Sequence, residues 1–271
     1  MFIHILNAVQ STDSYFQQRA DCTGLVGLSA LQKVVPAMRI LAYGVPLDVV
    51  DEYAQIATFG KEYMCSPTPV DVARLLQDGE SRGFSGTLDS IDCMHWEWRN
   101  CPAAWKGMFT GRGKRPSMIL EAVASRDLWI WHAYFGLPGS YNDINVLRRS
   151  HIFLAYTRGE SPPVHFSVNG WKNDMGCYLA DGIYPEWSAF VKSARHPMER
   201  KTQRFAAMQE SACKDIKRAF GVLQARWAVI HGPAYGWDRE HLSDIMTACI
   251  IMHNMIVEDE KSKLIQETEI F

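Results

Sequence analysis

Residues 117–135 contain two strand-like runs joined by a three-residue turn, and this pair constrains the fold most. The first run, SMILEAVA, is apolar, and the alternation of IWHAYF in the second favours a β-strand. A third run, residues 87–92, precedes them and ends in Asp92, while a Gly-Pro-Gly-type loop and a helix start carrying Asp143 follow them. The sequence therefore predicts an α/β fold with acidic residues at the ends of its elements.

The segments before this region predict a small helical N-terminal part, residues 1–58, and a connector, residues 59–86. Apolar residues recur at helical spacing over residues 29–44, where Pro36 is expected to bend or split the helix and Gly44 to end it. A second helix is expected from Pro46, since proline suits the first turn. Two short helices around a glycine suit either a helix-turn-helix or a plain helical hairpin, and the pattern leaves both open.

The segments after the central region alternate helix, loop and strand. A helix is expected over residues 142–159 with Asn142 as its N-cap, followed by a loop over residues 159–176. A short strand at residues 177–185 carries Asp181, and a long amphipathic helix covers residues 204–230 with a kink at Gly221. A core helix over residues 242–260 and an acidic tail, residues 258–271, close the chain.

Composition narrows the class of protein. The 271 residues suit one large domain or a medium domain with a smaller companion. Seven cysteines without a CxxC pair argue against a zinc ribbon and favour reduced thiols, as in the cytosol or nucleus. No apolar run reaches the ~18 residues that span a bilayer, so no membrane association is expected. The formal charge of −2 carries no global nucleic-acid signature, so any DNA contact must come from local basic patches.

The best local patch is the loop at residues 99–116, which is rich in basic and aromatic side chains. Such a loop suits phosphate contact, and a merely solvated basic loop is equally compatible with the sequence. The candidate DNA-binding residues are Lys106, Arg112, Lys114 and Arg115, beside Trp105 and Phe109.

Three acids at element ends, Asp92, Asp143 and Asp181, form the candidate chemical site. Carboxylates that converge from different elements can hold Mg²⁺, and two such ions about 4 Å apart support phosphodiester chemistry. Each aspartate alone is more typical of a turn or cap residue, and the set of three in one α/β region is compatible with a metal site and with turn or cap roles alike. A serine hydrolase is the rival enzyme class, but the sequence has no G-x-S-x-G elbow and offers no partner for His95 or His132.

The predicted order strand, strand, strand, helix, strand, helix matches a ribonuclease H-like mixed sheet flanked by helices. Five blocks go further and resemble plant PIF/Harbinger-type transposases, which carry the DDE domain named transposase 4 and include domesticated relatives called Antagonist of Like Heterochromatin Protein. The resemblance implies a nuclease domain at residues 87–257. The blocks are SIDCMHWEWRNCPAAWKG, ILEAVASRDLWIWHAYFGLPGSYNDINVL, YLADGIYP, SACKDIKRAFGVLQARW and CIIMHNMIVE.

The resemblance implies an endonuclease and strand transferase that uses Mg²⁺ or Mn²⁺ to cut DNA at terminal inverted repeats. Asp92 matches the first catalytic aspartate of the family, and Asp181 matches the second. Asp143 matches an additional acid, and the motif also allows it to be the second catalytic position.

The third acid of the family is a glutamate in a motif that usually reads VERAFG, but here the segment reads IKRAFG and Lys217 takes its place. The interval from Asp181, 217 − 181 = 36, supports the alignment. Lysine removes an anionic ligand and adds a cation where a metal should bind. Asp215 points ~200° around the helix and Glu210 lies ~10 Å along its axis, so neither replaces the glutamate. Impaired or absent catalysis is expected.

A second departure lies at residues 58–60, where family members carry a further helical stretch that this sequence lacks. The missing piece belongs to the helix-turn-helix region, so independent DNA binding is expected to be weak. The family also implies a Myb-like accessory protein and allows a homo-oligomer. A nuclear location, with a cytoplasmic pool also allowed, follows from the resemblance. The alternative function is a non-catalytic, domesticated nuclear protein that acts through protein or chromatin contacts.

Overall fold

The structure is a computed structural model, and it describes residues 2–20, 26–44, 59–159, 162–168, 170–193 and 196–268. These residues form two compact units, which we call the helical unit and the sheet unit. The helical unit comprises Met1–Met64, Glu97–Pro102 and Val222–Phe271, and the sheet unit comprises Cys65–Trp96 and Ala103–Gly221. The candidate acids all belong to the sheet unit. The bounds of this unit are not those of the nuclease domain expected at residues 87–257.

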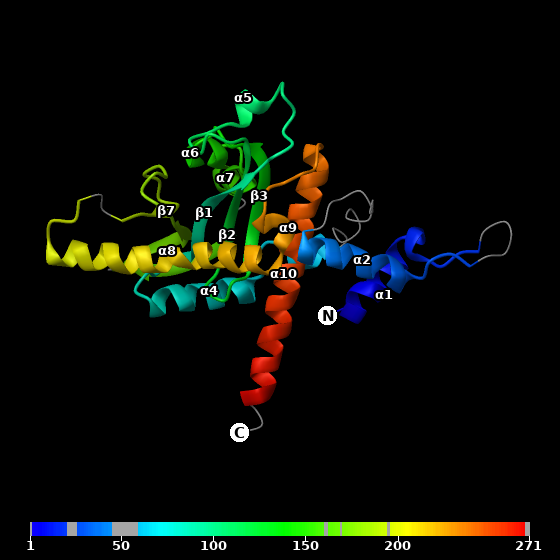
Figure 1. The fold of residues 1–271 in the computed structure, drawn as a ribbon. Coiled ribbons are helices and arrows are strands. Elements are labelled where there is room, and N and C mark those ends of the chain that lie inside the picture. The colour runs from blue at the N-terminus through cyan, green and yellow to red at the C-terminus, as the bar shows by residue number, and fades with distance from the viewer. Residues whose placement is uncertain are drawn as a thin grey trace. The chain divides into compact units, whose positions relative to one another are not determined.

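The sheet unit contains a mixed five-stranded sheet with the strand order β3-β2-β1-β6-β7 (Figure 1). β2 and β3 pair antiparallel, whereas β6 pairs parallel with both β1 and β7. This arrangement confirms the predicted mixed α/β sheet flanked by helices. The strands are β1 (Thr87–Glu97), β2 (Ser117–Ala124), β3 (Ile130–Pro138), β6 (Cys177–Leu179) and β7 (Phe190–Val191).

The predicted hairpin is present, and β2 has the predicted bounds. Ser125 N donates to Trp129 O at 3.0 Å across the turn, and Leu128 adopts a φ of 73° that delays the start of β3 to Ile130. The register then pairs Glu121 with Tyr134 and Val123 with His132. The local sequence therefore determines this part of the fold.

Strand β1 extends further than predicted. It continues five residues past Asp92 to Glu97, so Asp92 lies within the strand rather than at its end. The parallel partner β6 ends at Leu179, opposite Ser90. Asp92 consequently lies just beyond the point where the two strands stop pairing, which leaves one side of β1 open for a site.

Two further predictions were wrong in the same region. The helix expected over residues 142–159 is two helices, α6 (Asp143–Leu147) and α7 (His151–Arg158), because the Ser150 hydroxyl caps the second by accepting from Ile152 N at 3.3 Å. The expected loop at residues 159–176 contains an antiparallel hairpin of β4 (Pro163–Val168) and β5 (Trp171–Met175). Gly170, with a φ of 84°, lies in its turn.

Helices cover both faces of the sheet. α8 (Arg200–Arg226) crosses one face, and α6 and α7 lie on the other (Figure 1). α8 starts at Arg200, before the predicted residue 204, and continues through Gly221. It ends at Arg226, whereas the helix was expected to reach residue 230. The connector region contains α4 (Pro69–Ser81), which Thr68 caps, and the basic loop contains the short helix α5 (Lys106–Phe109).

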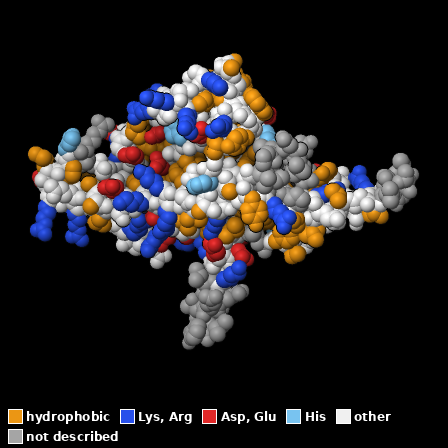
Figure 2. Space-filling view, viewed as in Figure 1, with side chains coloured by type: hydrophobic (Ala, Val, Ile, Leu, Met, Phe, Trp, Pro, Cys, Tyr) orange, Lys and Arg blue, Asp and Glu red, His pale blue; other side chains and the backbone are white. Residues whose placement is uncertain are grey.

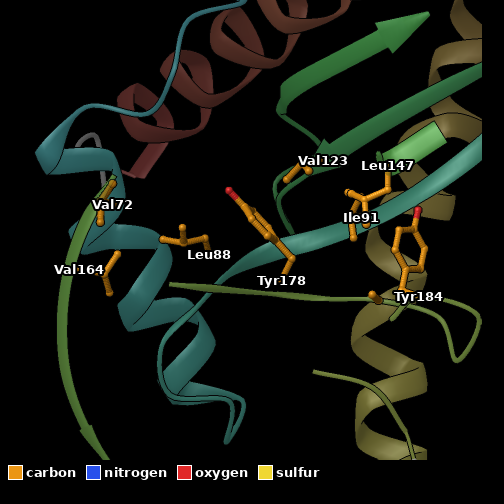
Figure 3. Packing of buried hydrophobic residues seen from close by; sticks show 9 residues of the cluster. Val72, Leu88, Ile91, Val123, Leu147, Val164, Tyr178 and Tyr184 are labelled. Carbon is orange, nitrogen blue, oxygen red and sulfur yellow. The ribbon is translucent and has the colours of Figure 1, made fainter. Parts of the chain in front are cut away.

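Two apolar clusters lie between the sheet and the helices, one on each face of the sheet. Figure 3 shows the larger one, in which Ile91 of β1 lies beside Leu147 of α6, and Tyr178 of β6 lies near Leu88 and Val123. The smaller cluster packs Phe84 and Leu179 against Ala212 of α8. Adjacent residues of β6, Tyr178 and Leu179, therefore contribute to opposite clusters, as the alternation of a strand requires.

The helical unit contains five α-helices among its described residues: α1 (Phe2–Thr12), α2 (Ala30–Tyr43), α3 (Gly60–Tyr63), α9 (Ala228–His231) and α10 (Arg239–Thr268). A short 3₁₀ helix, Ser14–Phe16, follows α1. Helix α2 is not split at Pro36, and Gly44, with a φ of 68°, ends it as predicted. The predicted acidic tail continues α10 as helix to Thr268.

The helix expected from Pro46 lies outside the described residues, so the choice between a helix-turn-helix and a helical hairpin stays open. The six cysteines of the described part are free thiols, and Cys22 lies outside it. No described helix has the length and apolar character needed to cross a bilayer.

Gln209 anchors α8 to the sheet, which yields a stability prediction. Its buried amide donates to Ala180 O at 2.9 Å and Val191 O at 3.0 Å. We expect Gln209→Ala to lower the free energy of unfolding by about 1–3 kcal/mol, because the buried Ala180 carbonyl loses this donor and the Val191 carbonyl keeps only Ala180 N among the described residues. Urea denaturation measures the change. Gln203→Ala, an exposed glutamine on the same helix, is the control, and an equal loss in both variants would contradict the anchoring role.

Candidate functional site

Asp92 lies at the centre of the candidate site, on the α8 side of β1. Its Oδ1 accepts a hydrogen bond from Cys93 N at 2.8 Å, and the side chain is only 17% exposed. Burial raises the pKa of Asp92, while the Cys93 amide and Lys217 lower it and Asp143 and Asp181 raise it further. The three predicted acids therefore share one electrostatic environment.

Lys217 faces this carboxylate, as the sequence alignment predicts. Its Nζ lies 3.8 Å from Asp92 Oδ2, and its side chain is 60% exposed. The contact is an ion pair with a solvent-facing cation, so water screens part of the attraction. The ammonium nevertheless occupies the side of Asp92 from which a metal ion would approach along α8.

Asp143 begins α6, where the Asn142 side chain caps the helix as predicted by accepting from Asn145 N at 2.9 Å. Burial is the main cause that raises the pKa of Asp143. A hydrogen bond with the Cys93 thiol and the nearby His95 lower it, whereas Asp181 raises it. Asp143 thus faces β1 from the opposite face of the sheet to α8, with Cys93 between them.

Asp181 follows β6 by two residues and is exposed. Its carboxylate accepts from Gly182 N and its carbonyl accepts from Tyr184 N at 3.1 Å, so it forms a tight turn. The residue still acts on Asp92 and Asp143 electrostatically. Asp181 therefore forms a turn and also contributes negative charge at the acidic end of the sheet.

Asp215 does not replace the missing glutamate. The residue is buried and pairs with Arg82 and, at 3.7 Å, with Arg218. This agrees with the expectation that it points away from the site. Its charge stabilises the contact of α8 with α4 instead.

Two residues of the site were not expected from the sequence. Cys213 lies one turn before Lys217, and burial followed by the charges of Asp92 and Asp181 raises its pKa to about 12. Tyr184 places its hydroxyl 3.7 Å from Cys93 Sγ on the other face. Both side chains surround the acids with weakly polar groups that stay neutral at ordinary pH. The i, i+4 spacing of Cys213 and Lys217 was the only available signal for the first.

The two histidines without an assigned partner have structural ones. His95 Nδ1 lies 3.1 Å from Ser117 Oγ, and His132 Nε2 lies 3.2 Å from Ser150 Oγ and 3.6 Å from Glu121 Oε2. Since the serine and the glutamate approach the same nitrogen of His132, this group is not arranged as a hydrolase triad.

The basic loop is closed by a short pairing of Thr110 with Pro116, and its four predicted basic side chains are all exposed. Gly111 approaches the Gly139 backbone so closely that a Cβ there would lie 2.1 Å from Gly139 O. The loop is therefore held beside the segment that leads to Asp143. Figure 2 shows Lys and Arg side chains gathered over α5 and α6. The four predicted residues are Lys106, Arg112, Lys114 and Arg115.

The comparison with protein families decides the identity. The model described as plant transposon protein matches residues 61–264, which is most of the chain. The chain belongs to this family. The match confirms the resemblance to PIF/Harbinger-type transposases and their domesticated relatives, and it covers all three acids and Lys217.

A relative from Arabidopsis thaliana named "Protein ALP1-like" is 28% identical over 160 residues. The aligned part is 56% of this chain and 38% of the relative, so the chain spans well under two thirds of that protein. No solved structure matches the chain.

Transposases of this family generally use divalent metals, but the site of this member does not fit one. The described residues contain no group of three or more His, Cys, Asp or Glu side chains placed to hold a metal ion. Among the described residues, the ion pair that Asp92 forms is with the Lys217 ammonium. A Mg²⁺ or Mn²⁺ ion would meet a like charge at 3.8 Å from its first ligand.

The raised pKa of Asp143 predicts a pH-dependent stability. Between the ordinary Asp pKa of about 3.9 and the raised folded value, the native state binds more protons than the unfolded state, so stability falls as pH rises. We expect Asp143→Asn to melt at a higher temperature than the parent at pH 7. The difference should vanish at about pH 3, where both states are protonated. Thermal unfolding at both pH values tests this, with Asp174→Asn, an exposed site, as the control. A lower melting temperature for Asp143→Asn at pH 7 would show that its charge stabilises the fold.

Proposed function

We propose that this chain is a transposase-derived nuclear protein of ribonuclease H-like fold that binds DNA without cutting it. The observation that carries the proposal is the ion pair between Lys217 and Asp92, with 3.8 Å between Nζ and Oδ2. An internal cation at this position substitutes for the metal ion that the family's chemistry requires.

The sheet topology supports the proposed fold. β1 lies in the middle of the sheet, pairs with the hairpin strand β2 on one side and with the parallel strand β6 on the other, and carries Asp92. Asp181 follows β6, and α8 brings position 217 to the same place. The approach of these three elements, which are distant in sequence, supports the proposed DDE arrangement.

Charge explains why catalysis would fail while the fold persists. A carboxylate at position 217 would attract a divalent ion together with Asp92, whereas an ammonium repels it. The ammonium also offsets part of the repulsion among the three acids, because it lowers the pKa of Asp92. Lysine at this position therefore favours the folded, metal-free state over a metal-loaded state.

The proposed DNA contact uses the basic loop of Lys106, Arg112, Lys114 and Arg115. The loop is exposed, and Trp105 stacks on the buried Phe109 with 6.2 Å between ring centroids, so the Trp105 ring is held in an exposed position among the cations. Arg149, which lies over the Tyr141 ring at 4.7 Å, extends the basic surface toward α6. A Myb-like accessory protein would supply the remaining affinity and nuclear entry, as the family implies.

The first test restores the missing acid. We expect Lys217→Glu to acquire Mn²⁺-dependent thermal stabilisation that the parent lacks, worth about 2.7 kcal/mol at a hundredfold excess over Kd. Differential scanning calorimetry with and without Mn²⁺ measures it. Adding Asp92→Asn to Lys217→Glu should abolish the gain, and Lys214→Glu, another lysine of α8, should not produce it. Plasmid nicking by the same proteins measures catalysis directly. Metal-dependent nicking by the parent that Asp92→Asn removes would refute the non-catalytic proposal and restore the nuclease as its function.

The second test concerns DNA. Replacing Lys106, Arg112, Lys114 and Arg115 by glutamine should weaken duplex binding equally for all sequences and reduce the slope of log K against log salt. Each lost phosphate contact reduces the slope by about 0.9. Fluorescence anisotropy over a salt series measures both quantities. The control replaces another basic run, Arg200, Lys201 and Arg204, which we expect to matter less. A larger effect from the control would move the DNA surface to the start of α8.

A further inference from the structure

The sheet unit contains a second candidate site that the transposase chemistry does not use. It is a cavity of about 180 Å³ between the sheet and α7. Leu88, Val123 and Tyr178 of the sheet form one wall, and Ile152, Ala155 and Tyr156 of α7 form another. In Figure 3 the Tyr178 ring lies between Leu88 and Val123. Ser66 and His151 line the cavity and are exposed, so it communicates with solvent.

Asp89 points into this cavity rather than toward Lys217. Ser90 faces α8, since its Oγ donates to Ala212 O at 3.1 Å, and Asp92 faces the same way toward Lys217. The register shift between Thr87 and Asp89 allows Leu88 and Asp89 to line the same cavity. From Asp89 onward, successive residues point to opposite faces, so Asp89 and Ile91 face α6 and α7. Asp89 lines the cavity accordingly.

The carboxylate of Asp89 has an atom without a partner. Its Oδ2 is buried and accepts no hydrogen bond within the described part of the chain. Burial raises the pKa of Asp89 well above its usual range, and Asp127 raises it further, whereas Arg74 lowers it. Arg74 does not neutralise Asp89, because its guanidinium is bound to Asp127 at 2.8 Å. A buried acid without a partner costs stability and calls for a compensating group.

The rest of the cavity wall shows what kind of group would fit. Trp131, Tyr156 and Tyr178 present aromatic rings, and the Tyr156 hydroxyl is already engaged with Gly176 O. Aromatic faces around a carboxylate attract organic cations. The aliphatic side chains of Leu75, Leu88 and Ile152 suit an apolar stem. A cavity of about 150 Å³ holds benzene, so this one has room for an amine on a short alkyl chain.

We propose that this cavity binds a primary ammonium group on a short aliphatic stem, as in a lysine side chain, with Asp89 as its counter-ion. The ammonium pairs with the unpartnered Oδ2 of Asp89, and the stem lies along Leu88 and Ile152 between the aromatic rings. The site is independent of Lys217 and of DNA binding, so its test does not depend on the proposed function.

The test uses the full chain and two pairs of probes in isothermal titration calorimetry. The pairs are n-pentylammonium with 1-pentanol, and Nα-acetyl-lysine methylamide with its norleucine counterpart. We expect each ammonium to bind at least about tenfold more tightly than its neutral match, as hydrogen bonds to a charged partner suggest. Binding of both ammonium probes supports a lysine of a partner protein as the ligand, and binding of pentylammonium alone supports a free amine.

Three variants locate the site. Asp89→Asn keeps the shape of the side chain and should weaken pentylammonium binding at least about tenfold without changing that of pentanol. Its melting temperature should not fall, because it removes a buried unpaired acid. Ala155→Leu fills the cavity and should weaken both probes. Asp174→Asn, an exposed carboxylate of β5, is the matched control and should change neither.

Two results would overturn the proposal. One is equal affinity for pentylammonium and pentanol, unchanged in Asp89→Asn, which would make water the only partner of Asp89 and the cavity a plain apolar one. The other is a lack of pentylammonium binding at millimolar concentration in a folded parent protein.

Discussion

The acidic end of the sheet depends on one contact, the approach of Lys217 Nζ to Asp92 Oδ2 at 3.8 Å. That contact depends in turn on the anchoring of α8. Gln209 ties the helix to the carbonyls of Ala180 and Val191, and Ser90 of β1 binds the carbonyl of Ala212. Position 217 follows Gln209 by eight residues, which places it about 12 Å along the axis and about 80° around the helix. These anchors therefore determine which position of α8 lies opposite Asp92. The residue type at position 217 determines the chemistry of the contact.

Two buried acids lie on opposite faces of β1 and differ in their electrostatic surroundings. Asp92 faces α8 and has a cation beside it, whereas Asp89 faces α7 and has an oxygen without a partner. The strand's alternation separates the two environments, although only two residues lie between Asp89 and Asp92. Burial raises the pKa of both carboxyl groups, but Lys217 offsets part of the effect at Asp92 alone. Asp89 thus has a buried oxygen without a hydrogen-bond partner away from the inherited acids, as Glu121 does elsewhere among the described residues.

Local signals in the sequence predicted the local parts of this structure. The apolar run of β2 and the cap at Asn142 depend on neighbouring residues, and both appear where expected. The interval between Asp181 and Lys217 also placed the lysine opposite Asp92, because family motifs carry tertiary information. The division of the expected helix at Ser150 was missed, since a serine inside a helical pattern becomes a cap only when the chain turns there.

Longer-range features were beyond the sequence patterns. The extension of β1 past Asp92 depends on its neighbours in the sheet. In the hairpin of β4 and β5, β4 alternates apolar and polar residues, but β5 lacks the apolar alternation that marks a half-buried strand. Asp92 has an open side because β6 ends at Leu179. No residue near Asp92 in the sequence indicates where β6 ends. The partnerless oxygen of Asp89 likewise results from packing, because Arg74 is held by Asp127.

The lysine at position 217 separates two properties that a transposase normally combines. Cutting requires a metal, and the metal requires carboxylates that an ammonium opposes. Attraction of the DNA backbone requires only positive charge, and a lysine adds to it. Substituting Lys for Glu therefore replaces an anion that the family's catalysis would use with a cation, within the same helix and the same sheet. Because the basic loop beside Gly139 is built from other residues, the substitution leaves it intact. The proposed loss of cleavage and the proposed DNA contact thus rest on different residues, and for this reason we propose a binding role for the chain.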